Sequence, residues 1–214
     1  PSSALHYPES RFRYDRLNWA SNEIRLIRIL PHNPNTVTNG GYEPLECEVA
    51  SISLDTKPRY IALSYAWGDA ALARPILLNG KTFHATASLD AALRQICKMQ
   101  MGSSKLRDEY FWIDALSINQ KDEIEKSWQV QRMNQIFQEA QYALVWLGPS
   151  SDDSGKAMEA LEQVGLSVTA GTDPLDNTTL NTFNIFSKLY NEVSPSINNL
   201  LTRAWWRRMW VVQE

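Results

Sequence analysis

Short apolar runs separated by polar turns recur along much of this chain. Three of them are rich in β-branched and aromatic residues and predict buried strands at 59–65 (RYIALSY), 110–114 (YFWID) and 142–148 (YALVWLG). Segments with helical periodicity lie between them, at 88–100 and 122–140. Because strands that alternate with helices of this length favour βαβ crossovers, the pattern predicts an α/β fold. Its central sheet is expected to be mostly parallel and flanked by helices.

Both helical segments carry start signals of their own. Ser88 precedes the apolar stripe of the first segment and is expected to be its N-cap. Asp122, with Glu125 three residues later, is expected to begin the second segment in a variant of the capping box.

Further patterns add to this sheet at both ends of the chain. Asn79-Gly80, between two apolar runs, predicts a hairpin within 75–85. Segments 23–30 and 45–54 flank a loop rich in Pro, Asn and Gly, and they predict an N-terminal antiparallel pair at the sheet edge. Helical patterns at about 155–166 and 180–190 predict a helical insertion after the third strand.

Composition narrows the function classes. With 43% apolar and 21% charged residues in 214, the chain has the composition of a soluble globular protein, and no apolar run approaches the roughly 20 residues of a membrane-spanning helix. The net charge of −3 gives no broad attraction to phosphate backbones, so we expect no nucleic-acid partner; only RAWWRR (203–208) offers a local basic patch. The start of the chain lacks the apolar region of a secretory signal, which favours a cytoplasmic location.

The usual motifs of metal and nucleotide chemistry are absent from the sequence. The two cysteines, Cys47 and Cys97, form no metal-ligand spacing, and the three histidines are scattered. The sequence contains no Gly-rich phosphate loop, no serine nucleophile elbow and no histidine triad. We therefore expect no metal and no bound cofactor.

Polar and aromatic side chains follow two of the predicted strands. In an open parallel sheet the ligand crevice lies outside the carboxyl ends of the strands. Tyr65, Trp67 and Asp69 come at the end of the first strand, and Asp114 and Asn119 come at the end of the second. We expect the two loops to be neighbours and these side chains to line a ligand site.

A structural interpretation of the same residues is open. Trp67 and Trp112 would then belong to the core, Asp114 would cap a turn, and Asn119 and Gln120 would begin the next helix.

The stretch 203–214 (RAWWRRMWVVQE) combines aromatic rings with a carboxylate. On one helix Trp206, Trp210 and Glu214 fall at i, i+4 and i+8, so an aromatic stripe leads to the carboxylate. Such rings offer a stacking platform for a planar base, and partial desolvation would raise the pKa of the acid. The alternative is an amphipathic helix packed on the sheet, with its arginines in solvent.

Taken together, these stretches closely resemble the three signature blocks of the fungal heterokaryon-incompatibility (HET) domain. The blocks are YIALSYAWGD (60–69), FWIDALSINQKDEIEKSWQVQRMNQIFQEAQYALVWLG (111–148) and RAWWRRMWVVQE (203–214), in the family's order. The resemblance continues weakly upstream, which implies an N-terminal extension at 1–22 and a HET domain over 23–214. Ser117 stands where the family usually has cysteine, so this position tolerates a small, weakly polar side chain.

The HET domain in turn looks like a distant relative of the TIR (Toll/interleukin-1 receptor) domain. This resemblance implies that the α/β fold is of flavodoxin or TIR type. In TIR domains that cleave NAD, a Trp is followed four residues later by the catalytic Glu, and Trp210 and Glu214 have this spacing. The resemblance implies that Glu214 is the catalytic carboxylate of an NAD hydrolase, with NAD as a substrate. It places around that substrate Tyr65, Trp67, Asp69, Asp114, Asn119 and Trp210.

The family resemblance implies a role in fungal non-self recognition, a form of innate immunity in which incompatible fusion triggers programmed cell death. NAD cleavage to nicotinamide and ADP-ribose would then be switched on by self-association and by an activating partner protein or domain. The alternative is a non-catalytic death-signalling adaptor that acts by self-association alone. Because no Gly, Asn or Pro follows Glu214 to cap the last helix, we expect the natural protein to continue.

Overall fold

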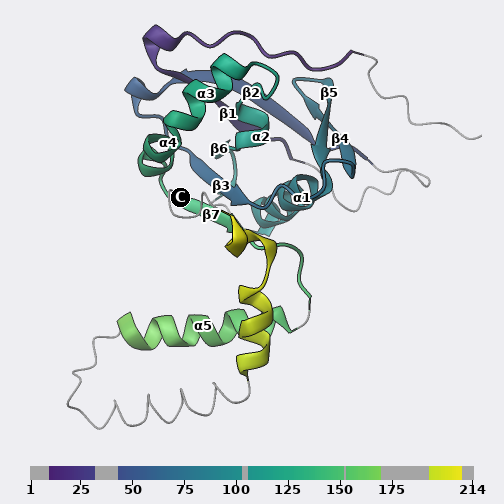
Figure 1. Ribbon diagram of the computed structural model, residues 1–214, viewed down its shortest axis with the longest axis vertical. Helices are drawn as coiled ribbons and strands as arrows, with labels where there is room; N and C mark the ends of the chain where they lie inside the picture. Colours follow the sequence, from purple (N-terminus) through teal and green to yellow (C-terminus); the bar gives the residue numbers. More distant parts are fainter. Residues whose placement is uncertain (1–9, 32–42, 103–105, 152, 170–192, 209–214) are drawn as a thin grey trace, which may run out of the picture. The chain divides into compact units, whose positions relative to one another are not determined.

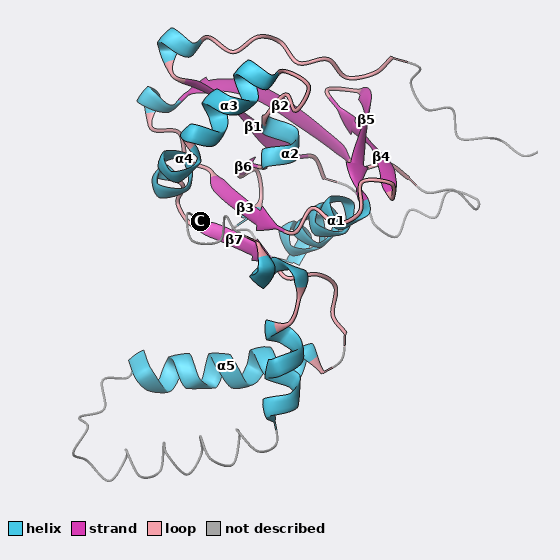
Figure 2. Ribbon diagram, in the orientation of Figure 1, coloured by secondary structure: helices cyan, strands magenta, loops and turns pink. Residues whose placement is uncertain are grey.

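A seven-stranded sheet organises the first part of the chain in the computed structural model (Figures 1 and 2). The structure describes residues 10–31, 43–102, 106–151, 153–169 and 193–208. The described residues up to Trp146 form one unit and residues 147–208 belong to a second, and each unit is described by itself.

The sheet has the order β5-β4-β2-β1-β6-β3-β7. Its strands are β1 (Glu23–Ile29), β2 (Glu46–Ser53), β3 (Ile61–Tyr65), β4 (Ala73–Leu78), β5 (Lys81–Thr86), β6 (Tyr110–Trp112) and β7 (Ala143–Trp146). The three strands expected from the apolar runs are thus present as β3, β6 and β7. The α/β class is confirmed.

Strand pairing makes the sheet mixed rather than mostly parallel. β3 pairs in parallel with β6 on one side and with β7 on the other, and β2 pairs in parallel with β4. β1 runs antiparallel to both β2 and β6, and β4 runs antiparallel to β5. The N-terminal antiparallel pair is therefore confirmed, but its expected place at the sheet edge is wrong, because β1 lies between β2 and β6.

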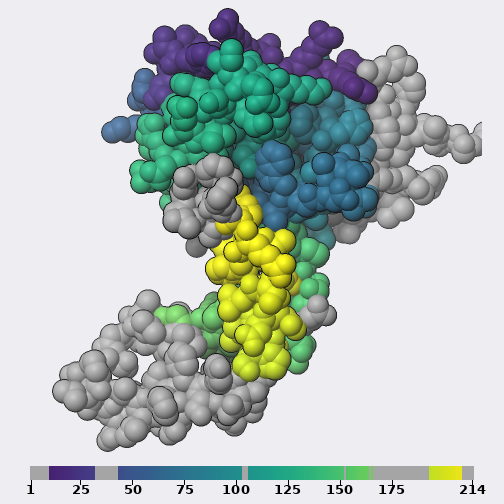
Figure 3. Space-filling view, viewed as in Figure 1, coloured from purple at the N-terminus to yellow at the C-terminus, as the bar shows by residue number. Residues whose placement is uncertain are grey.

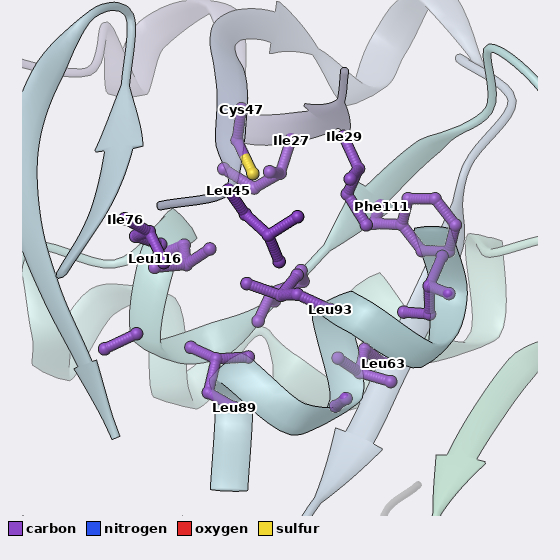
Figure 4. Packing of buried hydrophobic residues seen from close by; sticks show 14 of the residues in the cluster. Ile27, Ile29, Leu45, Cys47, Leu63, Ile76, Leu89, Leu93, Phe111 and Leu116 are labelled. Carbon is purple, nitrogen blue, oxygen red and sulfur yellow. The ribbon is translucent and has the colours of Figure 1, made fainter. Parts of the chain in front are cut away.

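Both faces of the sheet are covered by helices, since successive side chains of a strand point to opposite faces. On one face α1 (Ala87–Gly102) packs Leu89 and Leu93 against Ile27, Leu63 and other strand residues (Figure 4). On the other face α4 (Met133–Glu139) packs with Leu26 and Trp112. The central strands are consequently buried on both sides, as their continuous apolar sequences require.

The helical segment predicted at 122–140 is two helices. α3 (Glu123–Gln131) begins at the expected N-cap, Asp122, whose carboxylate accepts from the main-chain N–H groups of Ile124 and Glu125. The helix ends at Arg132, with φ −102° and ψ 0°, and α4 follows. Apolar periodicity continues across this break, which is why sequence alone predicts one helix.

Turn chemistry is confirmed at the hairpin and wrong at one helix cap. Asn79 and Gly80 take positive φ values of 48° and 70°, as a tight turn between β4 and β5 requires. At the start of α1 the expected N-cap, Ser88, instead donates its hydroxyl to the carbonyl of Ala66 at 2.7 Å. The Thr86 hydroxyl accepts from the N–H of Leu89 at 3.3 Å and takes the capping role.

The second unit contains α5 (Ser154–Thr169), a helix over 193–201 and the 3-10 turn η4 (Ala204–Arg207). α5 agrees with the helix predicted at about 155–166, whereas the segment predicted at 180–190 lies outside the described residues. Arg203 donates to the carbonyl of Leu147 at 3.1 Å and to the hydroxyl of Ser151 at 3.0 Å. This arginine of the RAWWRR patch is therefore engaged within the chain, although the second interpretation of the stretch placed it in solvent.

Candidate functional site

The loop after β3 turns sharply and brings one tryptophan to the surface. Tyr65 ends the strand and is buried in the core. Two residues later Trp67 is 41% exposed. Gly68 has a φ of +72°, and a Cβ there would lie 3.2 Å from the Cβ of Ser88, so glycine suits both the conformation and the close approach to α1.

The loop after β6 begins with the one-turn helix α2 (Asp114–Ser117). The side chain of Asp114 accepts from the N–H of Ala115 at 2.7 Å through Oδ1. Its main-chain carbonyl accepts from the N–H of Ile118 and from the side-chain amide of Gln120, both at 3.1 Å. These bonds close the loop on itself and leave Oδ2 directed elsewhere.

A hydrogen bond joins the two loops. Trp67 Nε1 donates to Asp114 Oδ2 at 2.7 Å, across 47 positions of sequence. The expectation that the loops are neighbours is confirmed, because parallel β3 and β6 end at the same edge of the sheet. That a ligand binds there stays a prediction.

This contact fixes an aromatic ring beside a carboxylate. An indole that is held through its N–H keeps its π-face available for stacking, and Trp67 is the exposed partner. The carboxylate can accept hydrogen bonds from hydroxyl or amide groups of a ligand. The pair thus suits a planar ring linked to a polyhydroxylated group.

Three other predicted site residues have local structural roles. Tyr65 points into the core rather than to the surface. Asp69 is exposed, and its Oδ1 accepts from the N–H of Ala71 at 2.8 Å within its own turn. The side chain of Asn119 likewise accepts from the N–H of Lys121 at 3.2 Å.

The structural interpretation is confirmed for Trp112, which is buried in the core, and is wrong for Trp67, which is exposed. It is also wrong for Asn119 and Gln120, because the next helix begins only at Glu123, after its N-cap Asp122.

A buried ion pair that the sequence did not predict supports the second loop. Arg25 of β1 pairs with Glu125 of α3, and their side chains are 2% and 4% exposed. Glu125 also accepts from the N–H of Asn119 at 2.7 Å. In a capping box it would instead have reached back to the N–H of Asp122, so the expected variant holds only for the Asp122 half.

Ser117 lies fully buried beside this ion pair. Its hydroxyl accepts from the N–H of Ile113 at 3.1 Å, and its carbonyl accepts from Arg25 at 3.0 Å. A small, weakly polar side chain fits this enclosed position. The geometry gives it a structural task and no access to a substrate in solvent.

The expected helix through the C-terminal stretch is interrupted. Trp206 belongs to the 3-10 turn η4, and Arg208 after it is extended, with φ −77° and ψ 134°. The prediction that one continuous helix carries Trp206 in an aromatic stripe is therefore wrong at Trp206. Trp206 Nε1 donates to the carbonyl of Leu200 at 3.1 Å, while Trp210 and Glu214 lie outside the described residues.

Two concavities in the described residues lie away from the Trp67–Asp114 contact. One of about 380 Å³ is lined by residues 16–19, and another of about 530 Å³ is lined mainly by β2 and the β4–β5 turn. Neither wall includes Trp67 or Asp114.

Within the same described ranges, no three His, Cys, Asp or Glu side chains group as metal ligands would. None of the helices there has both the length and the apolar character needed to cross a membrane.

Comparisons with known proteins agree with the sequence blocks. The family model described as heterokaryon incompatibility protein (HET) matches residues 60–214. Heterokaryon incompatibility protein 6, OR allele, of Neurospora crassa is 37% identical over 164 residues, which are 72% of this chain and 23% of that protein. The chain thus spans less than a quarter of the curated relative's length. No solved structure matches it.

Proposed function

Since this chain belongs to the heterokaryon incompatibility (HET) family, we propose that it acts in fungal heterokaryon incompatibility, where fusion of incompatible partners leads to cell death. The family match over residues 60–214 supports this role, as does the 37% identity to heterokaryon incompatibility protein 6. Because the chain spans only 23% of that relative, the activity of the whole protein is part of the proposal.

At the level of chemistry, the proposed activity is hydrolysis of NAD to nicotinamide and ADP-ribose. The observation that carries it is the 2.7 Å hydrogen bond from Trp67 Nε1 to Asp114 Oδ2 at the carboxyl edge of the parallel strands. This contact provides a stacking ring and a carboxylate where open α/β sheets bind ligands. Trp210 and Glu214 enter through their resemblance to the Trp-Glu spacing of NAD-cleaving TIR domains.

The proposed reaction breaks the bond between the ribose C1′ and the nicotinamide nitrogen. The bonding electrons leave with nicotinamide, which becomes neutral, and C1′ becomes oxocarbenium-like. A carboxylate such as Glu214 would stabilise that developing positive charge. Water then adds to C1′ and releases one proton, which gives ADP-ribose. Trp67 would stack on a ring of the substrate, and Asp114 would accept from its hydroxyl groups.

A second candidate function is a non-catalytic adaptor that acts by self-association. It is favoured by apolar side chains at the surface of the sheet's last strand, β7. Val145 is 40% exposed there, and Tyr142 just before the strand is exposed as well. In this case the Trp67–Asp114 contact would stabilise the loops and would bind no ligand.

Nicotinamide release distinguishes the two functions. The full-length protein is incubated with NAD at a concentration at which light scattering shows self-association. Glu214→Gln and Asp114→Asn are compared with Glu162→Gln and Asp108→Asn, which change exposed carboxylates of the same types. Hydrolysis requires release by the parent, loss in Glu214→Gln, reduction in Asp114→Asn and full activity in both controls. An associated parent that releases no nicotinamide leaves the adaptor function.

A further inference from the structure

We propose that Arg25 is a positioning residue for the Trp67–Asp114 contact, acting through Glu125 and the loop that follows Asp114. The inference rests on the proposed function only in its choice of site. Its central residue, Arg25, lies before position 60, where the family match begins.

The guanidinium of Arg25 ties three segments of the chain together. Its terminal nitrogens donate to both carboxylate oxygens of Glu125, to the carbonyl of Ser117 and to the carbonyl of Asp15. The ring centroid of Tyr14 lies 4.8 Å from the central carbon of the Arg25 guanidinium. A planar fork with several fixed donors can hold all of these acceptors at once, which a lysine ammonium cannot do in the same geometry.

Hydrogen bonds from this cluster reach every second residue of the loop that carries Asp114. The hydroxyl of Tyr14 donates to the carbonyl of Ala115 at 3.4 Å, Arg25 donates to the carbonyl of Ser117 at 3.0 Å, and Glu125 accepts from the N–H of Asn119 at 2.7 Å. Each of these three loop residues is thus bonded to the cluster formed by Tyr14, Arg25 and Glu125.

The loop needs such support because α2 is a single turn of four residues. A helix this short is not stable alone, since forming its first hydrogen-bonded turn fixes several dihedral angles for one bond. The residue before it, Ile113, supplies no side-chain cap. The direction of the Asp114 carboxylate therefore depends on the contacts that anchor α2.

The segment before β1 is part of the same support. Residues 10–22 lie beside α3 in the space-filling view (Figure 3), and Trp19 stacks on Trp128 with ring centroids 5.5 Å apart. The guanidinium of Arg132 lies over the Trp128 ring of this stack, with its central carbon 4.1 Å from the ring centroid. The described part of the N-terminal extension expected at 1–22 thus packs on the helix that supplies Glu125.

The test is the indole N–H resonance of Trp67 in a ¹H–¹⁵N spectrum of the full chain, assigned by its loss in Trp67→Phe. The variant Arg25→Met with Glu125→Met replaces a buried ion pair by apolar groups, which interiors often tolerate. We expect the Trp67 indole signal to move toward its position in Asp114→Ala. We also expect this N–H to exchange with solvent about tenfold faster, because a charge-assisted hydrogen bond is weakened.

A matched control lies on the same strand. Arg28→Met with Glu48→Met removes an exposed Arg–Glu pair and should leave the Trp67 signal in place. A folded Arg25/Glu125 double variant whose Trp67 signal and exchange rate equal those of the parent overturns the proposal. If that variant does not fold, Arg25→Lys decides in its place: an unchanged signal overturns the proposal and a shifted one supports it. Since no NAD is used, the result is independent of the proposed hydrolysis.

Discussion

Two arginines of strand β1, three residues apart, each pair with a glutamate in opposite environments. Arg25 and Glu125 have side chains that are 2% and 4% exposed. Arg28 and Glu48 have side chains that are 36% and 46% exposed, and Arg28 Nε donates to Glu48 at 3.0 Å. The same pair of residue types is therefore enclosed at one position of the strand and accessible to water at the other.

The comparison shows that burial and the number of partners, not the ion pair itself, decide what such a pair does. The exposed pair joins two neighbouring strands, since Arg28 lies opposite Glu48 in the register of β1 and β2. Its charges stay hydrated and are screened by salt. The buried pair connects parts of the chain that are 100 positions apart and orders main-chain groups around it. Only the buried pair can set the geometry of a distant loop.

The largest expected effect comes from breaking the buried pair on one side. Arg25→Met leaves the Glu125 carboxylate and two carbonyl groups without their donor in the interior, and we expect a loss of about 3–5 kcal/mol of unfolding free energy. Urea unfolding followed by circular dichroism at pH 7 measures it. Arg28→Met serves as the control and should unfold at nearly the parent's midpoint. A loss below about 1 kcal/mol in Arg25→Met would show that the pair is not strongly coupled to folding.

The apolar pattern and the turn residues were sufficient to predict several strands of the sheet. β3, β6 and β7 follow directly from their β-branched and aromatic runs, and the β4–β5 turn follows from Asn79-Gly80. The position of β1 could not be obtained in this way. Alternation identifies a strand but not its neighbours, so nothing in the sequence placed β1 between β2 and β6.

The candidate site was predictable in part for the same reason. The carboxyl-edge rule brought Trp67 and Asp114 together correctly, because it depends only on strand direction. The rule says nothing of side-chain direction, so it also included Tyr65, which points into the core, and Asp69, which closes its own turn. Arg25 was missed because a charged residue in an apolar strand has no sequence signature for a partner 100 positions away.

A smaller effect on the stability of the fold is expected at β2, where the adjacent residues Cys47 and Glu48 point to opposite faces of the sheet. Burial raises the pKa of the Cys47 thiol to about 12, with the neighbouring Cys97 and Glu46 adding to the shift, whereas Glu48 on the next position faces solvent. Because the pKa of the folded thiol lies above the unfolded value near 8.5, its stability contribution is complete below pH 8.5 and is lost as pH rises toward 12. We expect a loss of about 1 kcal/mol by pH 9.5.

Urea unfolding of the parent and of Cys47→Val between pH 7.5 and 9.5 measures this contribution. The valine variant should have a flatter profile, and Glu48→Gln should keep the slope of the parent. The range stops there because burial also raises the pKa of Tyr14 and of Tyr60. Above about pH 10 these phenols ionise in the unfolded chain and would add their own loss of stability. Parallel profiles for the parent and Cys47→Val would mean that the thiol is not coupled to unfolding.

The smallest effect is expected for the exposed pair. Arg28→Met with Glu48→Met should leave the urea midpoint at pH 7 nearly unchanged, because water and salt ions replace most of what the two charges provide each other. The hydrogen bond to Glu48 raises the pKa of Arg28, so the arginine keeps its charge and salt weakens the pair by screening. Raising the salt concentration should bring the parent and the variant together. A midpoint shift as large as that of Arg25→Met, and insensitive to salt, would mean that exposure does not separate the two pairs of β1.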